Sequence, residues 1–146
     1  MAFYEPDAGS PMASTYLRKH RSVAWYPTGD IQVRTLDGVA QEEGISSIDL
    51  LKLDVEGHEL AVLEGARETL ARTRAVQFEF GGSNIDSGAF LRDIVALLGG
   101  FRIYRLLADG LRPLRYDERF EVLTTTNFLA LREPATIEAP QQRGGG

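Results

Sequence analysis

The most apolar stretch of the chain covers residues 48–55 and reads Ile-Asp-Leu-Leu-Lys-Leu-Asp-Val. Its length and nearly continuous apolar character are typical of a strand buried on both faces in a parallel sheet. A second strand is predicted at residues 75–80. The helical pattern between the two strands calls for a right-handed crossover, so we expect them to be parallel neighbours, with 48–55 as the central strand.

Helical patterns follow each of these strands. The first helix opens at residues 56–59, whose acidic side chains lie in the first turn, where the helix dipole favours them. Gly65 interrupts it, and it continues over 67–71. The second helix is predicted at 87–98 and ends at two glycines. Its apolar face consists of Phe90, Leu91, Ile94, Val95 and Leu98.

The C-terminal part is richer in strands. Residues 101–106 and 127–131 are predicted strands, and a hairpin-like turn at Asp109-Gly110 leads into a further one at 111–114. Alternating strands and helices followed by a strand-rich end predict an α/β sheet.

The N-terminal part gives weaker patterns. A short strand is predicted at 2–4 and a short helix at 14–19. Residues 31–35, Ile-Gln-Val-Arg-Thr, alternate in the way typical of a strand. A short helix should follow, because Thr35 or Asp37 can cap it by accepting backbone N–H bonds.

Length and composition fit one soluble domain. The chain has 146 residues, of which 43% are hydrophobic and 25% charged. We expect a domain over 1–132 and a flexible tail over 133–146, where proline, glutamine and glycine predominate. The net charge of −5 disfavours nucleic acid and anionic membranes as partners, because both require a basic surface.

Several kinds of chemistry are excluded by residue type. There is no cysteine, so disulfides, thiolate metal sites and cysteine nucleophiles are excluded. His20 and His58 are the only histidines, which excludes a site with several histidine ligands. The first residues do not resemble a signal peptide and no apolar run reaches the length of a membrane span, so we expect a cytoplasmic protein.

Acidic residues stand where the two main strands end. Asp54 ends the first strand, with Glu56 just beyond it, and Glu79 ends the second. Ligands of open α/β sheets bind beyond the carboxyl ends of the strands, so these carboxylates mark a candidate site. Each has a structural alternative: Asp54 as a helix cap, Glu56 as a partner of the helix dipole, and Glu79 as part of an ion pair.

The polar neighbours of these acids have plainer interpretations. Lys52, within an apolar strand, should pair with an acid or extend to solvent. His58 is expected to be an exposed helix residue, and Glu59 to be solvated or in a salt bridge. Asn84 and Asp86 follow the second strand, where they could touch an acceptor or shape a turn.

Several segments together resemble one enzyme family. Residues 51–59, Leu-Lys-Leu-Asp-Val-Glu-Gly-His-Glu, with Leu-Glu-Gly-Ala at 63–66, resemble the hallmark segment of FkbM-type methyltransferases. Thr-Leu-Asp at 35–37, the strand and loop at 77–86, and Thr-Thr-Thr-Asn-Phe-Leu-Ala at 124–130 resemble further segments of that family. The resemblance covers most of the chain, and its motifs are specific in combination.

The resemblance implies a Rossmann-like class I methyltransferase sheet with S-adenosylmethionine as methyl donor. The implied acceptor is a hydroxyl of a saccharide or natural product. Methyl transfer needs donor and acceptor in line, and a hydroxyl acceptor also needs a general base. The candidate residues are Asp54, Glu56 and Glu79 for catalysis, Asp54 and Glu56 for the cofactor, and His58, Asn84 and Asp86 for the acceptor.

One expected feature is missing from the sequence. A cofactor site of this kind normally begins with a strand and a glycine-rich turn, and no such turn precedes Ile48. We therefore expect a sheet truncated on its N-terminal side, whose exposed edge can drive self-association. Two other functions stay open: a non-catalytic binding or assembly module, and a different α/β enzyme, such as a hydrolase, that uses Asp54 and Glu79 as an acid/base pair.

Overall fold

The fold comes from a computed structural model that describes residues 1–6, 14–17 and 24–133. The predicted tail therefore lies, apart from Glu133, outside the described residues. The elements, in chain order, are β1 (Ala2–Glu5), β2 (Tyr26–Asp30), α1 (Leu36–Glu42), β3 (Ile48–Leu53), α2 (Glu59–Glu64), α3 (Arg67–Ala71), β4 (Thr73–Phe80), α4 (Ser83–Ser87), α5 (Leu91–Leu97), β5 (Phe101–Leu107), β6 (Gly110–Pro113), the short 3-10 helix η1 (Glu118–Phe120) and β7 (Thr126–Arg132).

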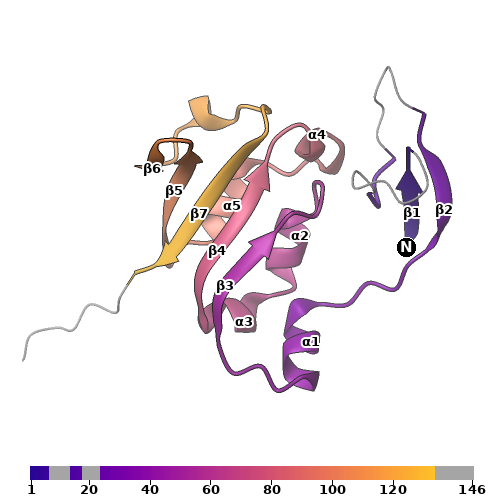
Figure 1. Ribbon diagram of the computed structural model, residues 1–146, viewed down its shortest axis with the longest axis horizontal. Helices are drawn as coiled ribbons and strands as arrows, with labels where there is room; N and C mark the ends of the chain where they lie inside the picture. The colour runs from indigo at the N-terminus through magenta and orange to yellow at the C-terminus, as the bar shows by residue number, and fades with distance from the viewer. Residues whose placement is uncertain (7–13, 18–23, 134–146) are drawn as a thin grey trace, which may run out of the picture.

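A five-stranded sheet forms the body of the molecule, in the order β3-β4-β7-β5-β6 (Figure 1). β3 and β4 are parallel, as the sequence predicts, with Leu53 beside Phe78. β7 lies between β4 and β5 and is antiparallel to both, so β4 and β5 run in the same direction. β6 closes the sheet as an antiparallel partner of β5. A mixed α/β fold is therefore confirmed.

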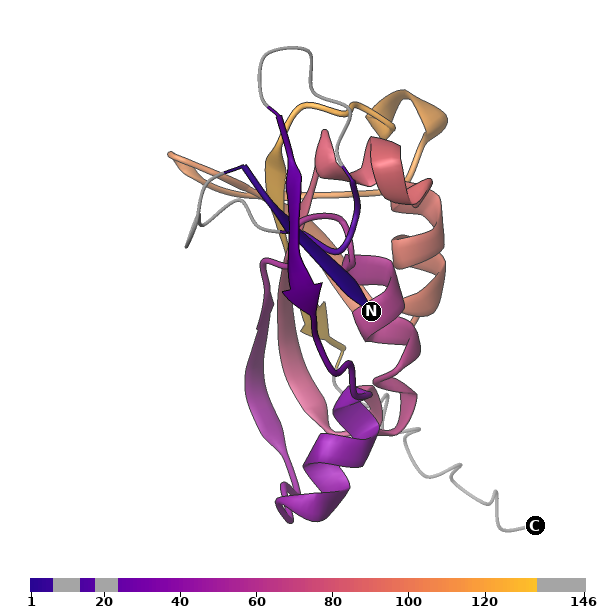
Figure 2. The ribbon, with the colours of Figure 1, turned by 90° about the vertical axis from the view of Figure 1, so that its right-hand side faces the viewer.

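The helices α2, α3 and α5 lie on one face of this sheet (Figures 1 and 2). Strand residues alternate between the two faces, and those that point toward the helices are buried. The rings of Phe78 and Phe128 stack with centroids 5.3 Å apart in the middle of this layer. The core also contains Leu53, Leu63, Val76, Phe80, Leu91, Ile94, Leu98, Ile103 and Ala130.

The other face of the sheet is open in the described part of the chain: no helix there packs on it (Figure 2). The β3–β4 register places Leu50 beside Ala75 and Lys52 beside Gln77 on this face. Leu50 is 53% exposed. We call this surface the open face.

The position predicted for 48–55 is wrong. β3 is an edge strand, because among the described residues it pairs only with β4. It is also covered on one face rather than two, since Leu53 is 5% exposed and Leu50 53%. An apolar run shows that both faces of a strand can be buried. It does not show whether other elements pack on each face.

Two N-terminal predictions also fail. Residues 31–35 do not form a strand; the strand β2 precedes them and pairs with β1 in a separate two-stranded sheet. The described residues of the predicted 14–19 helix, 14–17, are not helical, and Ser14 instead makes an isolated antiparallel bridge to Tyr4. The short strand expected at the N-terminus is confirmed as β1.

The helix predicted at 87–98 begins later than expected, because α5 starts at Leu91. Ser87 is the last residue of α4, and Gly88 caps α4 with a left-handed backbone (φ +70°). Leu91, Ile94 and Leu98 are buried as predicted, while Phe90 is 45% exposed because it stands outside the helix.

Helix capping explains the start of α1 and of α3. Thr35 caps α1 by accepting a bond from the Gly38 N–H at 3.1 Å, as the sequence predicts. Asp37 has a different role: its two carboxylate oxygens accept bonds from the N–H groups of Glu68 (3.1 Å) and Thr69 (2.7 Å) at the start of α3. Burial opposes ionisation of Asp37, but these hydrogen bonds prevail and lower its pKa.

No helix of the described residues is long and apolar enough to cross a membrane.

Candidate functional site

The turn that leaves β3 carries the main candidate residues. Asp54 is the first residue after the strand, and its side chain is 56% exposed. Its carboxylate lies 3.5 Å from the ammonium group of Lys52, which confirms that this lysine pairs with an acid. The N-cap of α2 is His58, which makes no side-chain capping bond. Asp54 therefore does not cap α2, and its structural contact is the ion pair with Lys52.

Glu56 and Gly57 give the turn its shape. Both have left-handed backbones, with φ of 52° at Glu56 and 100° at Gly57. A side chain at Gly57 would also collide with the next loop, because its Cβ would lie 2.6 Å from the carbonyl oxygen of Ser83. Only glycine fits there, so the turns after β3 and β4 are in direct contact.

Glu59 departs most from expectation. The sequence predicts a solvated or salt-bridged residue, but Glu59 is only 1% exposed. Its Oε1 accepts a hydrogen bond from the Val55 N–H at 3.2 Å, so the carboxyl group folds back under the turn. Burial raises the pKa of Glu59, and the neighbouring N–H groups and Asn84 offset part of that rise. The expectation failed because a glutamate at a helix start has no local signal for burial.

The loop after β4 is stabilised by a hydrogen bond between two of its own residues. Asn84 is 1% exposed, and its Oδ1 accepts a bond from the Gly81 N–H at 2.9 Å. Gly81 itself passes close to the start of β7, since a Cβ there would lie 2.6 Å from Thr125 Cα. In this structure Asn84 thus shapes the turn, whereas Asp86 is exposed on α4.

Glu79 lies one step before the end of β4. It is half-buried and pairs in register with Asn127 of β7. The β3–β4 ladder stops at Leu53 and Phe78, so Asp54 and Glu79 are the next residues along the two strands, and both follow the alternation onto the open face.

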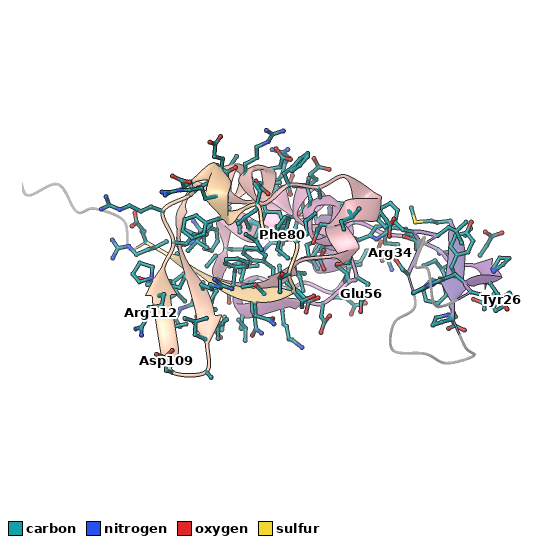
Figure 3. The ribbon with its side chains drawn as sticks, turned by 90° about the horizontal axis from the view of Figure 1, so that it is seen from above. Tyr26, Arg34, Glu56, Phe80, Asp109 and Arg112 are labelled. Carbon is teal, nitrogen blue, oxygen red and sulfur yellow. The ribbon has the colours of Figure 1, made fainter. Side chains whose placement is uncertain are left out.

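A hollow of about 330 Å³ lies beside the turn after β3, and we call it the Asp54 hollow. Its polar lining includes Asp54, Glu56 and His58. Its apolar lining is Phe3, Ile31, Val33, Val55 and Val62, with Met1 at the side, and Ser14 and Thr15 complete it. Figure 3 looks down on this edge and shows Glu56 between the sheet and the N-terminal strands. Glu79, Asn84 and Asp86 do not line this hollow.

His58 closes one side of the hollow and is half-buried, not exposed as expected. The ring of Tyr16 stacks on it with centroids 4.2 Å apart, and the Thr15 hydroxyl bonds to an imidazole nitrogen. Burial lowers the pKa of His58 below its ordinary 6.5, so the neutral imidazole prevails at neutral pH. A second hollow of about 350 Å³ shares His58, Val62, Val33 and Met1 with the first, so the two are neighbours.

Sequence reasoning missed two long-range contacts, one at the turn after β3 and one at the start of α5. Residues 14–16 reach the turn after β3, where the Ser14 hydroxyl donates to the Glu56 carbonyl oxygen at 3.3 Å. Glu121 accepts bonds from the N–H groups of Leu91 and Arg92, both at 2.9 Å, and so caps α5 from 30 residues away. Contacts across such separations leave no local pattern.

Among the described residues, no group of three histidine or carboxylate side chains lies close enough together to hold a metal ion.

These features define an α/β protein with a carboxylate-bearing hollow at the carboxyl end of a parallel strand. The sequence model of the methyltransferase FkbM domain matches residues 2–105. The chain belongs to this methyltransferase family, as its motifs predict.

One curated relative is 2-O-methyltransferase NoeI of Sinorhizobium fredii (strain NBRC 101917 / NGR234). The two proteins are 38% identical over 81 residues, which are 55% of this chain and 33% of NoeI. The match thus spans about a third of the relative's length. No solved structure matches the chain significantly.

Proposed function

We propose that this chain is an S-adenosylmethionine-dependent O-methyltransferase domain that acts in the cytoplasm on a hydroxyl of a saccharide or natural product. The observation that carries the proposal is the Asp54 hollow. Asp54, Glu56 and the neutral His58 line it beside apolar side chains, at the strand end where α/β enzymes bind ligands. The family match and the name of the relative NoeI, an O-methyltransferase, support the same chemistry.

The hollow fits the chemistry of the proposed donor. S-adenosylmethionine, when bound, supplies a methyl group on a positively charged sulfonium. The carboxylates of Asp54 and Glu56 offset such a charge, and Phe3, Ile31 and Val33 offer apolar surface for a flat ring. A volume of about 330 Å³ is at the low end for a small-molecule site, and the neighbouring hollow extends it.

The chain's own residues can assist the acceptor. A hydroxyl that takes up a methyl group must release its proton, and a carboxylate within hydrogen-bonding distance can receive it. Asp54 is suited to this because it is exposed at the hollow. Glu79, the next acid along the sheet edge, is the second candidate base. Neutral His58 can accept a hydrogen bond from another acceptor hydroxyl and orient it.

The sheet supports the Rossmann-like arrangement that the resemblance implies. Parallel β3 and β4 are joined by the helices α2 and α3, and the candidate site follows β3. The outer edge of β3 is unpaired in the described part of the chain, and no glycine-rich turn precedes Ile48. We therefore expect the chain alone to bind S-adenosylmethionine weakly or not at all in isothermal titration. Micromolar binding would contradict this.

The decisive assay uses a chimera in which this chain takes the place of the matched segment of NoeI, so that the remainder of that protein is supplied. The chimera is incubated with radiolabelled S-adenosylmethionine and a panel of saccharides, and methylated product is counted. We expect transfer to at least one hydroxyl acceptor. A folded chimera that binds the donor but methylates no acceptor would favour the non-catalytic binding module.

A further inference from the structure

Two buried polar side chains join the loops that carry the candidate acids. Glu59 and Asn84 are each 1% exposed, on α2 and α4. Each is held at one end: Glu59 Oε1 accepts from the Val55 N–H, and Asn84 Oδ1 accepts from the Gly81 N–H. One side chain therefore fixes the turn after β3, and the other fixes the turn after β4.

The remaining polar atom of each side chain could pair with that of the other. Glu59 Oε2 is an acceptor and Asn84 Nδ2 is a donor, and neither makes a hydrogen bond in this structure. The Asn84 amide is nevertheless close enough to stabilise the Glu59 carboxylate. Buried polar atoms that lack partners are costly, so a small movement that joins this donor to this acceptor is favourable.

The backbones of the two turns also approach each other closely. Ser83, next to Asn84, contacts the backbone at Gly57, where a Cβ would lie 2.6 Å from its carbonyl oxygen. The turns held by Glu59 and Asn84 are thus already in contact at the backbone.

We propose that Glu59 and Asn84 are a positioning pair, in which the Asn84 amide donates to Glu59 Oε2 and locks the turn bearing Asp54 and Glu56 against the loop that follows Glu79. The role in positioning rests on the proposed function. The pairing itself does not, and it can be tested without any activity.

A swap of the two groups tests the pairing. Glu59→Gln leaves two amide donors facing each other, and Asn84→Asp leaves two carboxylates. The double variant Glu59→Gln/Asn84→Asp restores one donor and one acceptor, and each new side chain keeps an oxygen that can accept from the N–H of Val55 or Gly81. The unfolding equilibrium constant of each variant is measured in urea at pH 7 on the full chain. The effect of the double variant should differ by about tenfold or more from the product of the two single effects. Glu64→Gln, at an exposed position on the same helix, is the control and should show no coupling with Asn84→Asp. Additive effects of the two swap mutations would overturn the pairing.

A measurement on the unmodified chain covers the case in which the variants do not fold. The side-chain amide signals of Asn84 in a ¹⁵N NMR spectrum should shift as Glu59 titrates, and amide signals that stay constant through that titration would overturn the pairing. In the NoeI chimera, Glu59→Gln should lower kcat more than it raises the KM for the donor, and the double variant should recover it. Coupling in the chain without methyl transfer by the unmodified chimera would reject the proposed function and leave the pair intact.

Discussion

The two faces of β3 both carry leucines, but these leucines have opposite surroundings. On the helix side, Leu53 and Phe78 are 5% and 0% exposed and share a core with Leu63 of α2 and Ile94 of α5. On the open face, Leu50 belongs to the same strand as Leu53 yet is 53% exposed. The covered face holds the molecule together, while the open face and the carboxyl edge carry the candidate chemistry and an apolar surface without a cover in the described chain.

The largest expected effect comes from a matched pair of leucines. Leu53→Ala should lower the free energy of unfolding by about 2–5 kcal/mol, because it opens a cavity in the core. Leu50→Ala, three residues earlier on the open face, should change it by about 0.5 kcal/mol or less. Urea unfolding of both variants measures the difference. Equal losses would show that the open face is covered in solution.

The open face and the free edge of β3 should also promote association. An unpaired strand edge with apolar neighbours is a surface for pairing with another copy of the chain. Light scattering should give a mass that rises with protein concentration, and Leu50→Lys should return it to that of a monomer. Leu107→Lys, on the exposed part of β5, is the control and should leave association unchanged. A stable monomer at every concentration would argue against a truncated sheet.

A smaller effect should appear in the pH dependence of stability, because Glu59 is buried whereas Asp54 is exposed. Because burial raises the pKa of Glu59, its protonated form contributes stability that is fully present below about 4.5 and is lost as pH rises through the raised pKa. The melting temperature of Glu59→Gln relative to the unmodified chain should therefore increase from pH 4 to pH 8. Parallel melting curves across that range would mean that Glu59 is not buried as described.

Much of the sheet could be predicted from the sequence because local patterns specify it. The apolar run at 48–55 and the next strand at 75–80 predicted two parallel strands, and these are seen as β3 and β4. The alternation at 31–35 misled because, among the described residues, this segment belongs to neither sheet, and an alternating pattern has meaning only against a neighbouring strand. The break at Gly88 was missed because one left-handed residue overrides an otherwise helical pattern.

The position of the Asp54 hollow follows from the sequence, but its internal contacts do not. The acids at strand ends indicated the edge where this hollow lies, and Asp54 and Glu56 both line it. The burial of Glu59 and the approach of Tyr16 to His58 depend on how distant segments fold against the turn. Such contacts are set by tertiary packing, for which a single sequence carries no local signal.

The central claim is that Asp54 acts in chemistry rather than in folding. Asn has the size of Asp but no charge, and Asp54 caps no helix, so Asp54→Asn should change the free energy of unfolding by about 0.5 kcal/mol or less. Loss of a positioned proton acceptor should lower methyl transfer by about a hundredfold. The direct measurement is the transfer rate of the NoeI chimera with and without Asp54→Asn, alongside its melting temperature. A near-normal rate in the variant would contradict the account and move the catalytic role to Glu79.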